Sequence, residues 1–505
     1  MLDVPDGMDV HEWMLTQGWS DGLPLVPPTL ERVEAMLTGT ARMGHELLGK
    51  CAPCYGEVTV EKCAIAAVMA GCAPRQFTVV LAAVEAMLHP NFNIHGVSAT
   101  TMGATPCIIV NGPVRHAAGL NMSHGALGSG SRANAAIGRT LKLVLQNVGG
   151  AKLRGTESTT IGTPLKFTAC LAEWEERASV WEPLHVAATE RANEFERSDS
   201  AVTIMAVMSG PHQIVDGEMG LDGTPEHNAE QLCQLLASSL SSAYSPAIPM
   251  INNAVLVISP EHYDTLVTGG YRSKAQLQCR LWDLTNKHMV PHIPTLVGRV
   301  IVRKLVARFG KSSVALFVIK ACGHLIGTLI GLFARFFTIV TGRGLTLLPK
   351  FDKPESLHVV VAGGPAGKFS AFMPSFGFLR EGPISNLSRP VTCRVETPQT
   401  TSGAYSTPPE ATTRVLNPTA SLPAPFTLAK RSDTGELLGD IALLSISKRG
   451  SDELLRCLAH KLCKRFPCVN VAHFTKPTFS RPAPAELMQH IIDSGFKHAV
   501  VALAD

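Results

Sequence analysis

The chain has 505 residues and a mass of 53.9 kDa, a size that suggests two or three domains. Hydrophobic residues make up 45% of it and charged residues only 17%, which excludes a largely disordered protein. Its 45 basic and 41 acidic residues nearly balance, so the composition does not indicate a nucleic-acid-binding surface.

The first part of the chain alternates helical and strand patterns. Apolar runs of strand length occur at 202–208, 254–258 and 357–362, with helical patterns between them. Strands that alternate with helices predict an α/β domain. Apolar periodicity predicts further elements, a strand at Cys107–Val110 and helices at Val10–Gln17, Val58–Ala70, Gln76–Leu88 and Ala133–Asn147.

Residues 396–427 are rich in Pro, Thr and Ser and lose all apolar periodicity, which predicts a linker. After it the order strand, helix, strand, helix, strand fits the first half of a doubly wound sheet. The fold class is therefore α/β, with a large N-terminal α/β domain at 1–395, which we expect to bind the substrate, and a truncated doubly wound (βαβαβ) domain at 428–505. In that domain we predict strands at Asp440–Ile446, Cys468–Ala472 and His498–Leu503, and helices at Ser451–Lys464 and Pro484–Ser494.

The cysteines indicate a reducing compartment. There are 13 of them, an odd number with scattered spacing, and several lie in apolar runs. Cys51 and Cys54 form a CxxC motif, which is either a redox pair or two structural thiols; no second pair completes a zinc site. The N-terminus has neither a secretory signal nor a lipidation motif, so we expect a cytoplasmic protein.

The stretch Val314–Val340 is apolar and long enough to span a bilayer. Lys320, His324 and Arg335 interrupt it, and a charge at the bilayer centre costs about 2.5–3.5 kcal/mol. We therefore predict a helix that does not cross a membrane, and keep membrane association as the alternative.

Two loops of the first domain are candidate sites. Glycine-rich residues 125–132 precede a helix, so backbone N–H groups there, with Gly128, Gly130 and Arg132, can bind an anion. The other interpretation is a tight strand-to-helix turn. His95, followed by several hydroxyl side chains, is a candidate for acid–base chemistry or part of a capped loop.

An acidic and aromatic turn follows at 173–185. Glu173, Glu182 and His185 are weak candidates for divalent metal ligands, because carboxylates and imidazole bind such ions. The pattern matches no standard zinc motif, and a solvated acidic turn accounts for it equally.

The loops after the first two strands of the C-terminal domain carry cations and hydroxyls. Such loops meet at the carboxyl edge of a parallel sheet, where they can bind an anionic substrate or lower the pKa of a thiol or selenol. The candidate residues are Lys448, Ser451, Lys476, Ser480 and Arg481. The other interpretation is that these are ordinary loops between strands and helices.

The last 30 residues, Lys476-Pro-Thr-Phe-Ser-Arg-Pro-Ala-Pro484, a helix and the strand His498–Asp505, resemble the UGSC family of (seleno)proteins. Matching stretches of the long first domain are Gly18–Thr29, His95–Thr101, Arg132–Arg139, Trp181–His185 and Val361–Pro365. In that family the strand leads directly into selenocysteine (or Cys)-Gly-Ser-Cys. This chain departs from the pattern, because it ends at Asp505.

The resemblance implies a selenol- or thiol-dependent oxidoreductase. We expect a reading frame cut at a selenocysteine codon, with the catalytic selenocysteine immediately after Asp505. The alternative is that Asp505 is the natural C-terminus. The expected chemistry is reductive cleavage of a carbon–heteroatom bond, as in selenoprotein subunits of the glycine reductase type, or thiol–disulfide exchange. The expected partners are a small-molecule substrate and a thiol reductant, with no nucleic acid. The alternatives are a non-redox metal- or anion-binding protein and a membrane-associated scaffold.

Overall fold

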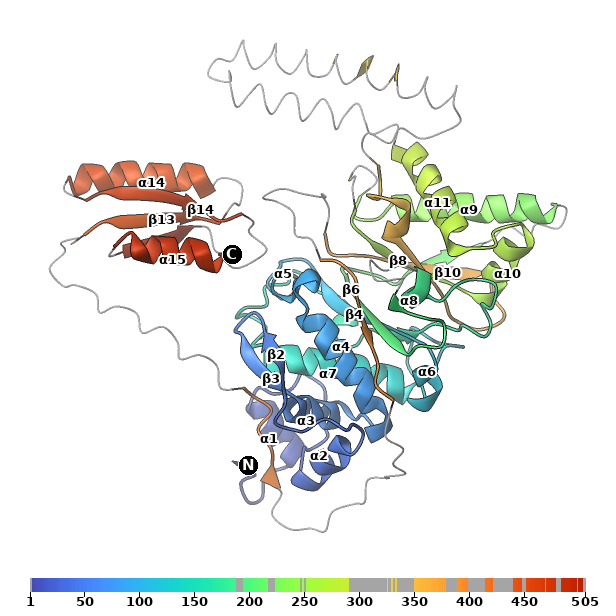
Figure 1. The fold of residues 1–505 in the computed structure, drawn as a ribbon, viewed down its shortest axis with the longest axis horizontal. Coiled ribbons are helices and arrows are strands. Elements are labelled where there is room, and N and C mark those ends of the chain that lie inside the picture. Colours follow the sequence, from blue (N-terminus) through green and yellow to red (C-terminus); the bar gives the residue numbers. More distant parts are fainter. Residues whose placement is uncertain are drawn as a thin grey trace.

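The fold is mixed α/β and contains several small sheets, as a computed structural model shows (Figure 1). The structure describes residues 2–187, 194–216, 223–245, 248, 251–289, 325, 328, 329, 332, 333, 349–377, 388–397, 414–420, 439–446, 451–467, 469–477, 483–496 and 498–502.

Two four-stranded sheets form the centre of the long first part of the chain. The first has the order β11-β6-β4-β5, and the second has the order β7-β10-β8-β9. The strands of the first sheet are β4 (Thr105–Asn111), β5 (Cys170–Ala172), β6 (Ala201–Val207) and β11 (Val391–Arg394). Those of the second are β7 (His212–Val215), β8 (Ala254–Ile258), β9 (Leu357–Val361) and β10 (Phe369–Pro374).

The two sheets repeat one topology. In the first sheet, β4 is parallel to β5 and antiparallel to β6. In the second sheet, β8 is in the same way parallel to β9 and antiparallel to β10. The edge strands are exchanged: β7 follows β6 but pairs with β10, whereas β11 follows β10 but pairs with β6. The long first part of the chain thus consists of two halves with the same topology, and each half contributes an edge strand to the sheet of the other.

The sheets pack face to face between two layers of helices. Cys107 and Ile109 of β4 lie in one apolar cluster with Val255 and Val257 of β8. Because successive side chains of a strand point to opposite faces, the alternate residues of both strands face helices instead. The first sheet is covered by α4 (Phe77–Leu88) and α7 (Arg132–Asn147), on which α3 (Val60–Ala70) packs. The second sheet is covered by α9 (Pro225–Ser241), α10 (Pro260–Thr268) and α11 (Lys274–Met289).

Shorter elements surround this core. Strand β1 pairs with β12, and β2 pairs with β3, both antiparallel. The bounds are β1 (Leu2–Asp3), α1 (Val10–Thr16), α2 (Leu30–Leu37), β2 (Leu47–Cys51), β3 (Gly56–Thr59), α5 (Ile94–Ser98), α6 (Val114–Ala117), α8 (Leu184–Ala187) and β12 (Arg414–Val415).

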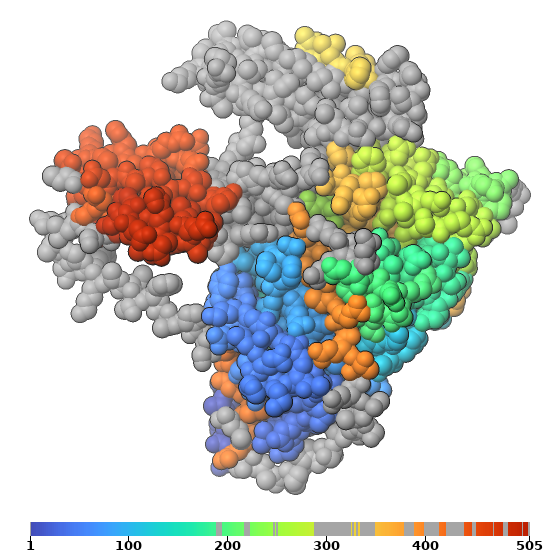
Figure 2. Space-filling view, in the orientation of Figure 1, coloured from blue at the N-terminus to red at the C-terminus, as the bar shows by residue number. Residues whose placement is uncertain are grey.

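The predicted linker at 396–427 is wrong in part. Its described segment 414–420 contains β12, and Val415 is fully buried in the first apolar cluster. Leu416 N donates a hydrogen bond to Pro28 O at 2.9 Å, and Figure 2 shows orange residues of this region lying on blue N-terminal ones. The Pro- and Thr-rich composition predicted a linker throughout, although residues 414–420 pack on the core. Residues 398–413 and 421–427 lie outside the described residues.

The C-terminal unit has the predicted βαβαβ order, with three parallel strands arranged β14-β13-β15. Figure 1 shows α14 and α15 on opposite sides of these strands, and separate apolar clusters line the two faces of β13. The elements are β13 (Ile441–Ser445), α14 (Ser451–Arg465), β14 (Val471–Thr475), α15 (Ala485–Asp493) and β15 (His498–Ala502). The prediction that β14 begins at Cys468 is wrong by three residues.

The apolar stretch Val314–Val340 lies outside the described residues, except for five helical positions. Four of these, Leu325, Leu329, Leu332 and Phe333, are 58–62% exposed. Among the described residues no single helix has the length and hydropathy to cross a bilayer, although the bent pair Pro74–Leu88 and Pro90–Ser98 passes by length and composition.

Candidate functional site

The carboxyl ends of parallel strands from both sheets meet at one place in the core. Trp174, two residues after β5, donates its N–H to Val361 O at the end of β9 over 2.7 Å. Gly363 N, two residues after β9, donates to Met122 O at 2.9 Å. In α/β folds this edge is where ligands bind, so we sought a site here first.

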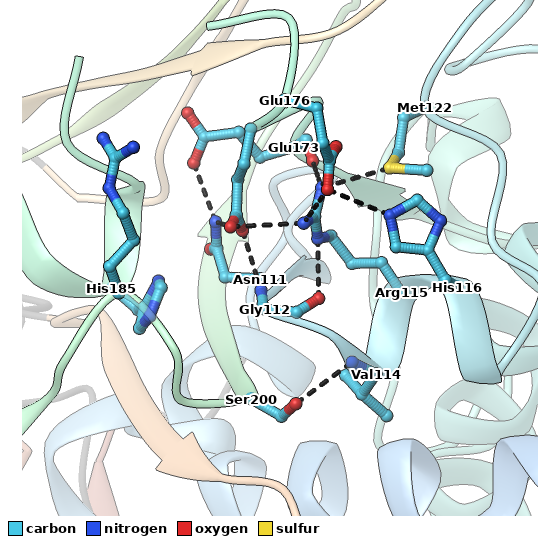
Figure 3. A network of polar contacts seen from close by, with 12 residues as sticks. Asn111, Gly112, Val114, Arg115, His116, Met122, Glu173, Glu176, His185 and Ser200 are labelled. Carbon is cyan, nitrogen blue, oxygen red and sulfur yellow. Dashed lines mark hydrogen bonds and ion pairs between the residues drawn. The ribbon is translucent and has the colours of Figure 1, made fainter. Parts of the chain in front are cut away.

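A buried polar network occupies this junction (Figure 3). Glu173 follows β5, is only 1% exposed, and pairs with the ammonium of Lys274 from α11. Its other carboxylate oxygen accepts hydrogen bonds from Asn111 Nδ2 and Leu184 N, both at 2.8 Å. This fully satisfied carboxylate joins the first half of the structure to the second, which is a structural role.

Arg115 of α6 extends the network toward the surface. Its Nε donates to Gly112 O at 2.7 Å, and its guanidinium pairs with Glu175 at 3.2 Å and Glu176 at 2.9 Å. His116 Nε2 lies 3.0 Å from Glu176 Oε1, and both of these side chains are more than half exposed. Burial acts to raise the pKa of Glu176, but hydrogen bonds from Arg115 and His116 outweigh it and lower the pKa to about 2. The outer end of the network is thus a carboxylate–imidazole pair that solvent reaches.

The structure does not bring the predicted metal ligands together. Glu173 is engaged by Lys274, and Glu182 is exposed and forms an ion pair with Arg197 at 3.5 Å. His185 is buried, and its Nε2 lies 3.0 Å from Glu196 O. Within the described ranges no group of three His, Cys, Asp or Glu side chains could hold a metal ion, so the weak metal prediction is wrong for these residues.

The glycine-rich loop lies near the same edge, and its arginine bonds to the end of a helix. A Cβ on Gly364 after β9 would be 2.8 Å from the ring of His124, so this loop contacts the second sheet. Gly130 has a φ of +105°, a conformation that favours glycine. Arg132 Nε donates to Gly71 O at 2.8 Å and thereby ties α7 to the end of α3. The rest of the Arg132 guanidinium is exposed, so the anion-binding role of Gly128, Gly130 and Arg132 stays a prediction.

His95 and Cys51 of the CxxC motif lie in surroundings that disfavour their charged forms. His95 Nδ1 lies 3.4 Å from the Tyr55 hydroxyl, and burial, with the charge of Lys476, lowers the pKa of His95. Burial and the neighbouring Cys54 raise the pKa of the fully buried Cys51 thiol to about 12. Both thiols are free. Cys51 is therefore a poor thiolate nucleophile.

The carboxyl edge of the C-terminal sheet brings two hydroxyl side chains together with the backbone of Lys476. Ser445 ends β13, and its hydroxyl lies 2.7 Å from the hydroxyl of Ser451, the first residue of α14. Lys476 follows β14 and donates its backbone N–H to Ser445 O at 3.0 Å. Its side chain is 9% exposed, and burial lowers its pKa. The other predicted residues of this edge, Lys448, Ser480 and Arg481, lie outside the described residues.

Sequence reasoning missed Asn111, Arg115, His116 and Lys274. The available signal was position, because Asn111 and the Gly-Pro turn directly follow a predicted strand; nothing in the sequence pairs Glu173 with Lys274, 101 residues away. Comparison with protein-family models, with curated proteins and with solved structures finds no match for this chain.

Proposed function

We propose that the chain is a thiol- or selenol-dependent oxidoreductase of two domains, the smaller of which binds the anionic group of a small-molecule substrate. The observation that carries the proposal is the convergence of Ser445, Ser451 and Lys476 at the carboxyl edge of the β14-β13-β15 sheet. The oxidoreductase class rests on the resemblance of residues 476–505 to UGSC proteins.

The strand order supports this edge as the binding place. The chain crosses from β13 to β14 on one side and then to β15 on the other, so the switch point of the sheet adjoins β13. Ligands of doubly wound sheets bind at such points. The N-terminus of the 15-residue helix α14 begins there and favours a negative charge.

Charges at this edge act in both directions. An anion beside the buried ammonium of Lys476 would offset the desolvation that lowers its pKa. Asp452 and Glu453, both exposed in the first turn of α14, oppose an anion. We therefore expect weak binding of a bare anion and tighter binding of a substrate with further contacts.

Buried thiols in the core of the first domain are poor candidates for redox chemistry. Burial raises the pKa of Cys51, Cys72 and Cys107 to about 12, so these thiols stay protonated at neutral pH. An edge that stabilises anions would instead favour a thiolate or selenolate brought to it.

The test uses the full chain and the variant Lys476→Met, with Lys461→Met on the exposed face of α14 as the matched control. Calorimetry measures inorganic phosphate binding, and a second assay follows thiol-dependent reduction of hydroxyethyl disulfide. We expect the wild type and the control to bind phosphate and Lys476→Met to lose that binding. Disulfide reduction is measured on the same three chains extended after Asp505 by selenocysteine-Gly-Ser-Cys, because the proposed selenol belongs to that motif. The extended wild type and control should reduce the disulfide, and the extended Lys476→Met variant should reduce it more slowly.

The two readouts separate the candidate functions. Phosphate binding that depends on Lys476, without any disulfide reduction by the extended wild type, would support the non-redox anion-binding alternative. Unchanged phosphate binding by Lys476→Met would reject this edge as the site.

A further inference from the structure

A cavity of about 480 Å³ opens between the loop Gly18–Gly22, helix α7 and residues 152–167. Pockets for small organic molecules measure roughly 300–1,000 Å³, whereas one water molecule takes up only about 30 Å³. The cavity therefore has room for an organic molecule and is far larger than a lone ion requires. None of its lining residues belongs to the sites described above.

Two lysines share one carboxylate in the wall of this cavity. Glu157 is 5% exposed, and its two oxygens accept hydrogen bonds from Lys142 Nζ at 2.7 Å and Lys166 Nζ at 2.9 Å. One positive charge is thus left uncompensated within this group. Burial lowers the pKa of Lys166, and a second anion nearby would relieve that cost.

The remaining charges at the cavity are also positive in sum when Arg139, which pairs with Asp21 from outside the lining, is included. Asp21 is the other acidic residue in the lining, but the guanidinium of Arg139 neutralises it through two hydrogen bonds of 2.7 and 2.8 Å. Lys152 adds an exposed ammonium. A negatively charged group therefore meets a favourable field in the cavity, and a cation meets an unfavourable one.

Large apolar side chains stand in water around the same cavity. Ile161 is 97% exposed, Leu153 is 72% exposed and Phe167 is 44% exposed, and all three line the cavity. Exposed apolar side chains that cluster around a concave surface are typical of a binding site, whereas single exposed apolar side chains are common on any protein surface. An apolar body placed against them would leave water.

We propose that this cavity binds a small organic anion that joins one carboxylate or sulfonate to an alkyl or aryl body. The acidic group lies toward Lys142, Lys152 and Lys166, and the apolar body lies along Leu153, Ile161 and Phe167. Inorganic phosphate would leave the apolar side chains in water, and a cationic amphiphile would meet the lysines. This site is independent of the one proposed at the C-terminal sheet.

Calorimetry on the full chain tests the proposal with three probes: dodecanoate below its micellar concentration, dodecyltrimethylammonium, and inorganic phosphate. The variants are Lys152→Glu and Ile161→Ser, which change exposed side chains. Their matched controls are Lys461→Glu on α14 and Ile492→Ser on α15, at residues that are also exposed. Circular dichroism and thermal unfolding confirm that each variant is folded.

We expect dodecanoate to bind to the wild type and to both controls with the same Kd, and each cavity variant to weaken it about tenfold. Dodecyltrimethylammonium should bind at least tenfold more weakly than dodecanoate. Equal binding of the two amphiphiles would overturn the proposal in favour of a general apolar surface. Absence of dodecanoate binding, or equal loss in the controls, would also overturn it.

Discussion

Replacing Lys274 with Met tests how the two halves of the structure are held together. Lys274 belongs to the helical layer of the second half and Glu173 to the first, and their side chains are 2% and 1% exposed. The substitution keeps much of the side-chain volume and removes the charge. Glu173 then retains the N–H groups of Asn111 and Leu184 but no buried cation.

The magnitude follows from that burial. Removing one partner of a buried ion pair costs about 3–5 kcal/mol, because the other charge stays in a medium of low polarity. Two remaining hydrogen bonds to the carboxylate place the expected loss near the lower limit, about 3 kcal/mol. Replacing both residues, Glu173→Gln with Lys274→Met, removes both charges and should cost less than either single change.

Urea unfolding followed by tryptophan fluorescence measures these values, since Trp181 is buried against Tyr263. The control is Arg177→Met, which breaks the exposed pair of Arg177 with Asp264 and should cost less than about 1 kcal/mol. Single changes that cost under about 1 kcal/mol, or a double change that costs their sum, would refute the argument.

Three further outcomes are expected. Acidification from pH 7 to 5 should lower the free energy of unfolding by about 2 kcal/mol through His358. Burial lowers the pKa of His358 to about 3 in the folded protein, whereas in the unfolded chain its pKa is near 6.5. His358→Gln should therefore reduce the change in free energy that urea unfolding measures between these two pH values. Gly112→Ala should destabilise the fold by more than about 2 kcal/mol, since φ is +79° and the new Cβ would lie 2.0 Å from a backbone oxygen, whereas Gly130→Ala, in open space, should cost about 1–2 kcal/mol in the same assay. Iodoacetamide should label exposed Cys457 well before buried Cys51, as mass spectrometry of the native protein will show; equal rates would contradict the buried thiol.

Local patterns predicted many elements of the fold but not how its strands pair. The apolar runs at 202–208, 254–258 and 357–362 became β6, β8 and β9 within one residue at each end. Antiparallel pairing was missed, because β7, β10 and β11 pair with strands far apart in the chain. The internal repeat was also invisible, since it resides in the topology and not in recurring residues.

The candidate sites were predictable only where position along the chain decides them. Lys476 lies at the carboxyl edge because it directly follows β14, and Ser451 because it begins the helix that follows β13. The direction of a side chain was beyond prediction: Arg132 bonds to the carbonyl of Gly71, and Glu173 to an ammonium from the other half. Such partners are set by tertiary packing, which periodicity does not report.

The exchange of β7 and β11 has a consequence for the junction at the centre of the molecule. Because each sheet borrows its outer strand from the other half, the two halves are tied to one another at the edges of both sheets. The hydrogen bond from Trp174 to Val361 and the buried pair of Glu173 with Lys274 fix the same relation at the carboxyl ends. The exposed pair of His116 and Glu176 thus lies next to residues contributed by both halves, and the buried guanidinium of Arg115 contacts Glu176. Because buried residues of both halves support this exposed pair, it can keep a defined geometry.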